Sequence, residues 1–310
     1  MLISLVVPVW NEEEAVPVFY RALDILGDLQ LELIFVNDGS SDSTAEVIER
    51  LIANDERLVL VNLRRNFGKE AALLAGFNYS TGDAVIPLDV DMQDPIELIP
   101  ELVTIWQQKG VDMVLARRSD RSADSFLKRI SSRWYYKMHN VLAREKIEEN
   151  VGDFRLLSRN TVDAICSLPE HTVFMKGMMP WVGGKTAILD YVRMPRVVGK
   201  TKFNGWSLWN FALDGITSFS TLPLRVWTYI GGVVAVISLL YGIWIVLSKF
   251  IWGNAVAGYS SLMTVMLFLG GVQLIGIGIL GEYIGRMYTE SKNRPRYIIE
   301  SVLRKKNDGQ

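Results

Sequence analysis

The chain has 310 residues, enough for one large domain with an appendage, and a formal net charge of −1. That charge gives no overall basic field and argues against nucleic acid as a partner. A single cysteine, Cys166, excludes an internal disulfide, and two histidines are too few for a histidine-rich metal site.

The first part of the chain alternates between strand and helix patterns. Between the strand-like runs, apolar residues recur at helical spacing, and the last expected helix of the series spans 95–108. Strict alternation of this kind predicts an α/β fold with a doubly wound, mostly parallel sheet. The apolar runs typical of buried parallel strands are 2–9, 31–36, 58–63, 84–88 and 112–116.

Polar residues recur where the predicted strands end. Asp38 follows the second strand, Asp89 and Asp91 follow the fourth, and Arg117 follows the fifth. In a doubly wound sheet, ligands bind in the crevice beyond the carboxyl ends of the strands. We therefore expect these four side chains to share one crevice.

The stretch from Leu88 to Pro95 carries the clearest chemical pattern. On an extended chain, side chains alternate between faces, so Asp89, Asp91 and Gln93 should point the same way. Two carboxylates and an amide oxygen suit Mg²⁺ or Mn²⁺, and Mg²⁺ commonly completes its shell with substrate phosphates. An isolated Asp-x-Asp is more often a solvated acidic turn, but the other strand-end residues favour a metal shared with a diphosphate.

Beyond Arg117 the chain changes character. Basic residues up to Arg133 are followed by the aromatic run 134–136. This pattern suits RNA, a helix lying on anionic lipid or a plain solvated helix, and the apolar segments downstream favour lipid over RNA. Strand-like composition returns at 151–158, and tryptophans indicate an interfacial amphipathic helix at 204–225.

Two charge-free runs, 226–248 and 260–281, approach the ~20 residues that cross a bilayer core. We expect two transmembrane helices within 226–281, joined by a short periplasmic loop with one lysine. The tail, 282–310, is rich in lysine and arginine, so the positive-inside rule places it and a large domain at 1–203 in the cytoplasm. Gly281-x-x-x-Gly285 allows close helix contact and suggests an oligomer.

Five motifs occur in order along the chain, at 6–12, 36–40, 89–95, Gly152-Asp153-Phe154-Arg155 and Gly199-Lys200-Thr201-Lys202-Phe203. Together with the two spans that follow, they resemble the motifs of family 2 glycosyltransferases, which have the GT-A fold. More narrowly, they resemble the polyprenyl-phosphate glycosyltransferases, whose members include bactoprenol glucosyl transferases and dolichol-phosphate mannose synthase. Two departures are Trp10 and Phe203, where the family commonly has tyrosine.

This resemblance implies a reaction: inverting transfer of glucose from UDP-glucose to undecaprenyl phosphate at the bacterial inner membrane. The product would serve O-antigen or other surface glycan modification. It also implies a homo-oligomer, specifically a tetramer, together with a flippase and a downstream glycosyltransferase as partners.

The resemblance also implies roles by position. The nucleotide sugar would contact Pro8, Trp10, Glu12, Asp38, Lys69 and Asp89. The metal, Mg²⁺ or Mn²⁺, would be held by Asp91, Gln93 and Asp89. The lipid phosphate would be held by Arg117, Arg129, Lys200 and Lys202. The catalytic set would be Asp89, Asp91, Asp153 and Arg117.

The expected chemistry needs little proton transfer. An acceptor phosphate is mostly ionised near neutral pH, because its second pKa is near ~6, so it can attack the anomeric carbon without a strong base. Asp153 is the candidate if a base is required, and a structural hydrogen bond explains it equally well. Arg117 and the metal would stabilise charge on the leaving diphosphate.

Three alternatives remain open from the sequence. The transferred sugar could be mannose, galactose, GlcNAc or an aminoarabinose, because nothing in the spacing selects glucose. A processive polysaccharide synthase would carry Gln-x-x-Arg-Trp, but here Ile130 precedes Arg133-Trp134 and only two spans follow. A non-catalytic nucleotide-binding scaffold conflicts with the intact Asp-x-Asp-x-Gln set.

Overall fold

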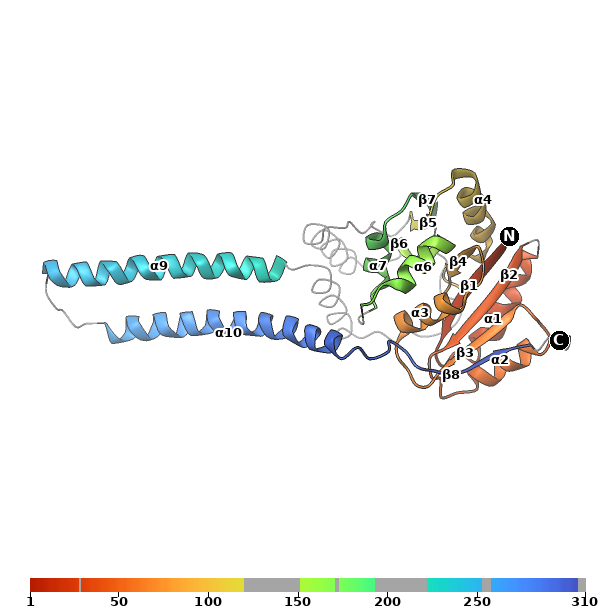
Figure 1. The fold of residues 1–310 in the computed structure, drawn as a ribbon, viewed down its shortest axis with the longest axis horizontal. Coiled ribbons are helices and arrows are strands. Elements are labelled where there is room, and N and C mark those ends of the chain that lie inside the picture. Colours follow the sequence, from red (N-terminus) through yellow and green to blue (C-terminus); the bar gives the residue numbers. More distant parts are fainter. Residues whose placement is uncertain (28, 120–150, 171–172, 193–221, 253–257, 306–310) are drawn as a thin grey trace. The chain divides into compact units, whose positions relative to one another are not determined.

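The computed structural model describes residues 1–27, 29–119, 151–170, 173–192, 222–252 and 258–305 (Figure 1). Two compact units result, one made of 1–141, 145–215 and 294–310, and the other of 142–144 and 216–293. The expected interfacial helix at 204–225 lies outside the described residues except for its last four positions. Arg129, Lys200 and Lys202 also lie outside them.

The first unit is built on one eight-stranded sheet in the order β7-β5-β6-β4-β1-β2-β3-β8. Strands β1 to β4 pair in parallel with one another, as do β5 and β7, so the predicted mostly parallel sheet is confirmed. The strands are β1 (Leu2–Val9), β2 (Gln30–Asn37), β3 (Leu58–Leu63), β4 (Ala84–Pro87), β5 (Met113–Arg118), β6 (Val151–Ser158), β7 (Thr186–Tyr191) and β8 (Ile299–Arg304).

Two strands break the parallel pattern. β6 is inserted between β4 and β5 and runs antiparallel to both. β8 runs antiparallel to β3, where the backbone N–H of Arg64 donates to the carbonyl of Ile298 at 3.0 Å and Asn62 Nδ2 donates to Ser301 Oγ at 3.0 Å. The sequence analysis did not predict β8, which covers the edge of the buried strand β3.

Helices cover both faces of this sheet (Figure 1). On one face Phe19 packs edge-on against Phe35, with ring centroids 6.3 Å apart. On the other, Gly76 lies so close to Val6 that a Cβ would overlap its side chain. The first face carries α1 (Ala15–Ala22), the short 3₁₀ helices η1 (Leu23–Leu26) and η2 (Ile96–Leu98), α2 (Thr44–Ile52) and α4 (Ile99–Lys109); the second carries α3 (Lys69–Tyr79), α6 (Arg159–Ser167) and α7 (Met175–Val182).

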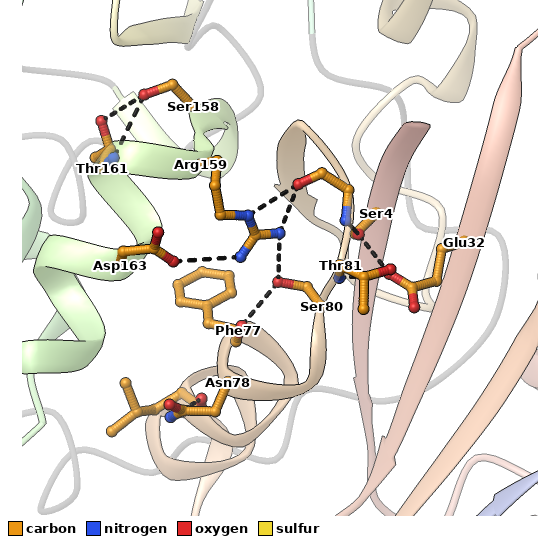
Figure 2. Close-up of polar contacts among 12 residues, drawn as sticks. Ser4, Glu32, Phe77, Asn78, Ser80, Thr81, Ser158, Arg159, Thr161 and Asp163 are labelled. Atoms are coloured by element: carbon orange, nitrogen blue, oxygen red, sulfur yellow. Dashed lines mark hydrogen bonds and ion pairs between the residues drawn. The ribbon is translucent and has the colours of Figure 1, made fainter. Parts of the chain in front are cut away.

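A polar network fixes the amino-terminal end of β4 against β1 and β2 (Figure 2). Arg159 Nε donates to the carbonyl of Gly82 at 2.9 Å, and its Nη2 donates to Ser80 Oγ at 3.1 Å. Ser4 Oγ donates to the buried carboxylate of Glu32 at 2.6 Å and accepts from the Gly82 N–H at 2.8 Å. These bonds satisfy buried polar groups and set the position of β4, whose other end leads into Asp89.

The strand order changes direction at β1, which has β2 on one side and β4 on the other. In a doubly wound sheet, this switch is where the ligand crevice lies, beyond the carboxyl ends of the strands. The segments that follow β1, β2 and β4 begin at Trp10, Asp38 and Leu88. The topology therefore brings the three predicted motifs to the same edge of the sheet.

The second unit consists of two long helices, α9 (Leu222–Trp252) and α10 (Tyr259–Ser291). They contact one another where Trp227 lies against Gly276, at a position where any Cβ would clash with the indole ring. Among the described residues, one segment, Phe268–Ser291, has the length and mean hydropathy, 1.4 over its best window, of a membrane span.

Candidate active site

The Asp-x-Asp-x-Gln motif forms a turn after β4. The strand ends at Pro87, and Met92 adopts a left-handed backbone conformation with φ of 56°. The side chains of Asp89, Asp91 and Gln93 are partly exposed, and the Gln93 N–H donates to Asp91 Oδ1 at 3.2 Å. The extended-strand argument for their common direction therefore does not apply to this turn.

The donor atoms of this turn fit a hard divalent cation. They comprise two carboxylates and an amide oxygen, the ligand types that Mg²⁺ and Mn²⁺ accept. In the part of the chain that the structure describes, no three His, Cys, Asp or Glu side chains gather into a metal cage. An ion here would therefore take its other ligands from water and substrate oxygens, as Mg²⁺ usually does.

Lys69 links the turn to β6. Its Nζ lies 2.7 Å from Asp89 Oδ1 and 2.7 Å from Asp153 Oδ2. Burial alone would lower the pKa of Lys69, but the charges of Asp153 and Asp89 raise it above its usual range. Lys69 is also the first residue of α3, where the helix dipole disfavours a cation, so the two carboxylates are needed to hold it there.

Two carboxyl groups beside Lys69 have opposite pKa shifts. Burial disfavours the ionised form of Asp153, but Lys69 and Lys176 outweigh it and hold the pKa of Asp153 well below its usual range. Glu70 accepts a hydrogen bond from the Met175 N–H at 2.9 Å, and burial together with the Asp153 charge raises its pKa to about 7. Asp153 is thus a weak proton acceptor, which favours its structural role over the base role.

The two arginines that end β5 have different partners. Arg117 forms a two-point ion pair with Asp190 on β7, with Nε–Oδ1 and Nη2–Oδ2 distances of 2.7 and 2.9 Å. Arg118 is half-buried, and burial would lower its pKa, but Tyr191, Asp94 and Asp153 raise it. Arg118 is therefore a guanidinium within electrostatic reach of Asp153, as is Arg155, and the sequence analysis gave Arg118 no role in the site.

Asp94 and Tyr191 form a buried pair behind the turn. Their exposed fractions are 6% and 5%, and Tyr191 Oη donates to Asp94 Oδ1 at 2.8 Å. Burial and the Asp94 charge raise the pKa of Tyr191 to about 12, so its hydroxyl keeps the proton that it donates. Tyr191 carries no sequence signal, because it lies in a short edge strand remote from any motif.

The predicted nucleotide side of the site is formed by the segments after β1 and β2. Trp10 exposes 41% of its surface, while Pro8 and Glu12 are partly exposed. Asp38 is buried and accepts from the backbone N–H groups of Phe67 and Gly68 at 2.7 and 2.9 Å. Asp38 therefore fastens the loop before α3 to β2, and burial raises its pKa despite these bonds.

Comparison with known sequences identifies the class of protein. Residues 4–166 match the model for glycosyl transferase family 2, and residues 222–287 match the model described as the GtrB C-terminal hairpin. The chain belongs to glycosyl transferase family 2. It is therefore a glycosyltransferase, in agreement with the family predicted from its motifs.

The most informative relatives match almost from end to end. The chain is 59% identical over 305 residues to the prophage bactoprenol glucosyl transferase homolog of Escherichia coli K12, covering 97% of this chain and 99% of that one. It is 60% identical over 307 residues to the SfII prophage-derived bactoprenol glucosyl transferase of Shigella flexneri, covering 98% and 99%.

A solved structure supports the fold. Glucosyl-3-phosphoglycerate synthase of Mycobacterium tuberculosis, crystallised with Mn²⁺, UDP-glucose and phosphoglyceric acid, superposes with a TM-score of 0.50 at 20% identity, covering 70% of this chain and 78% of that chain. At this identity the likeness concerns architecture alone. The sheet of the first unit is accordingly a GT-A-like α/β sheet.

Proposed function

We propose that this protein transfers glucose from UDP-glucose to bactoprenol phosphate, a polyprenyl phosphate, and releases UDP. The observation that carries the proposal is the identity of 59–60% over at least 97% of the chain with proteins named as bactoprenol glucosyl transferases or their homologs. The O-antigen role, the flippase and the downstream transferase that the family resemblance implies are kept as parts of this proposal.

The chemistry uses the strand-end residues in distinct roles. Asp91, Gln93 and Asp89 would hold Mg²⁺ or Mn²⁺, which supplies positive charge beside the donor diphosphate. The exposed ring of Trp10, with Pro8 and Glu12 beside it, would receive the uracil base and ribose. Asp38 would support the same nucleotide-binding part of the site by holding the loop before α3 against β2.

The transfer itself is a direct displacement. An oxygen of the lipid phosphate forms a bond to the anomeric carbon while the bond to UDP breaks, and UDP leaves with the bonding electrons. Because attack comes from the face opposite the leaving group, an α-linked donor gives a β-linked product. Lys69 would keep Asp89 in position beside the nucleotide sugar, and Asp153 would fix the position of Lys69.

The lipid end of the site is proposed from the sequence. Arg117, Arg129, Lys200 and Lys202 would hold the acceptor phosphate, and Arg118 joins them as a candidate because of its position near Asp153.

α9 and α10 would both cross the membrane, since each contains a charge-free run and the match to the hairpin model includes both. The active site would then face the cytoplasmic leaflet of the bacterial inner membrane, and the protein would act as a homo-oligomer, specifically a tetramer.

The experiment is a transfer assay with protein purified in detergent. Undecaprenyl phosphate is incubated with radiolabelled UDP-glucose, UDP-galactose, UDP-GlcNAc or GDP-mannose, and label in the butanol-soluble lipid is counted. We expect label from UDP-glucose alone, dependent on Mg²⁺ or Mn²⁺ and lost in Asp91→Asn. A lipid labelled by another sugar would correct the donor, and a label in polymer would indicate a processive synthase.

A further inference from the structure

We propose that Tyr191 is a positioning residue for the turn that carries Asp91 and Gln93, acting through the buried carboxylate of Asp94. Tyr191 lies on β7, and 97 residues separate it from Asp94 in the chain. The inference rests on the proposed function only in treating this turn as the metal and donor site.

Asp94 is the buried carboxylate of the turn. The other polar side chains of the turn, Asp89, Asp91 and Gln93, are partly exposed, whereas Asp94 is 6% exposed. A buried carboxylate is costly unless it is hydrogen-bonded or paired. The bond from Tyr191 Oη, at 2.8 Å, therefore ties the inner side of the turn to β7.

Both the ring and the backbone of Tyr191 are held by neighbouring residues. Its ring packs edge-on against Phe154 of β6, with centroids 5.9 Å apart and an interplanar angle of 83°. Its backbone carbonyl accepts from the Ser119 N–H at 2.8 Å and from Ser119 Oγ at 3.0 Å. The position of Tyr191 is therefore set by two neighbouring segments, β6 and the residue that follows β5.

The Tyr191 hydroxyl also contacts a positively charged side chain. Arg118 pairs with Tyr191 in the parallel register of β5 and β7, and its Nε donates to Tyr191 Oη at 3.3 Å. The hydroxyl thus accepts from a guanidinium and donates to a carboxylate. Replacing Tyr191 with Phe removes both bonds while preserving the ring and its packing on Phe154.

The test measures metal binding directly. Affinity for Mn²⁺ in the presence of UDP is determined by electron paramagnetic resonance for the full-length protein in detergent. Tyr20→Phe is the matched control, because Tyr20 Oη donates to Asp55 at 2.9 Å in the same way on α1. Residues behind metal ligands typically contribute 10–100-fold to affinity, so we expect Tyr191→Phe to weaken Mn²⁺ binding about 10-fold and Tyr20→Phe to leave it unchanged.

A transfer assay adds a second readout. Tyr191→Phe should raise the KM for UDP-glucose more than it lowers kcat, because it loosens the donor site without removing a group that touches substrate. An affinity for Mn²⁺ equal to that of the wild type, with melting temperatures lowered alike in Tyr191→Phe and Tyr20→Phe, would overturn the proposal and leave only a structural role.

Variants of Asp94 cover the case in which Tyr191→Phe does not fold. Asp94→Asn keeps an oxygen that accepts from Tyr191, so it should bind Mn²⁺ nearly as the wild type does. Asp94→Ala removes the acceptor and should lose affinity; unchanged binding by Asp94→Ala would reject the positioning role.

The metal-binding readout also separates this inference from the proposed function. If the wild-type protein binds Mn²⁺ and UDP, and Tyr191→Phe weakens that binding while no glucosyl lipid forms, the proposed function fails and the positioning role stands. If the wild-type protein binds no Mn²⁺, the positioning role is overturned.

Discussion

Lys69 sets the charge balance of the site at the scale of single residues. Its ammonium group forms ion pairs of 2.7 Å with both Asp89 and Asp153, so Asp153 stays ionised. The neighbouring Glu70 is the carboxyl group whose pKa is raised, to about 7. Where two close carboxyl groups have opposite shifts, they take different protonation states, and near neutral pH the proton is on Glu70 rather than Asp153.

Replacing Glu70 with Gln should therefore change how stability depends on pH. The pKa of Glu70 is about 7 in the folded protein against an ordinary value of 4.5, so the folded state binds this proton more tightly than the unfolded state does. Its ionisation lowers stability as pH rises between these values, by at most ~1.4 kcal/mol per pH unit. Glu70→Gln lacks this loss, and its melting temperature relative to wild type should rise from pH 5 to pH 7.5.

The control for this measurement is Glu97→Gln, which changes an exposed carboxyl group in η2. Its melting temperature relative to wild type should stay constant over the same range. A constant difference for Glu70→Gln as well would mean that Glu70 ionises in the folded protein as it does in the unfolded chain. Asp153 does not change the melting temperature differences over this pH range, because its lowered pKa affects stability only at more acidic pH.

The two arginines of β5 give a second prediction at the residue scale. Arg117 is paired with exposed Asp190, whereas Arg118 lies among Tyr191, Asp94 and Asp153. We expect Arg118→Ala to lower glucose transfer by about 100-fold or more, the effect of losing one group that stabilises developing charge. Arg117→Ala should lower transfer less if Asp190 holds the guanidinium during the reaction; the reverse order would favour Arg117 as the phosphate-binding cation.

At the scale of elements, β8 is the strand that ties the end of the chain to the sheet. Asn62 bonds to Ser301, and Asn78 Nδ2 donates to Tyr297 Oη at 3.1 Å, so side chains on both β3 and α3 hold the segment. Without β8, the backbone edge of the fully buried strand β3 would be exposed, and such edges promote association between chains.

Deleting residues 294–310 should therefore cause aggregation and lower the melting temperature. Deleting 306–310 alone is the matched control, since it leaves all of β8 in place. Size-exclusion chromatography in detergent and thermal unfolding distinguish the two variants. Equal behaviour of both deletions would show that the sheet does not need β8.

The whole molecule shows which features local sequence patterns can predict. The bounds of β3 and β6 agree with the predicted 58–63 and 151–158, because β3 is a mostly apolar run and β6 is a short segment of strand-like composition. β8 was missed because Ile299–Arg304 shows no regular alternation of apolar and polar residues, lies in a basic tail and becomes a strand only through pairing with β3. The antiparallel insertion of β6 is likewise a property of the assembled sheet.

The same limit applies to the site. The rule for strand ends in doubly wound sheets brings Asp38, Asp89 and Asp91 to one edge, and the topology agrees with it. The contact of Lys69 with Asp153 depends on where β6 is inserted, which no local pattern encodes. The different partners of Arg117 and Arg118, which are Asp190 and Tyr191, follow from the pairing of β5 with β7, which no local pattern encodes either.

The arrangement of the chain across the membrane gives the last prediction. With both α9 and α10 crossing, the connection between them and the first unit lie on opposite sides. In a Cys166→Ser background, Ala255→Cys should react with an impermeant maleimide in intact cells, while Asp24→Cys, at an exposed position of η1, should react only after permeabilisation. Labelling of both in intact cells would place the active site outside the cytoplasm, away from UDP-glucose. Protection of both would mean that the hairpin does not span the bilayer, and the match to the hairpin model would then describe a helical pair lying on the cytoplasmic side.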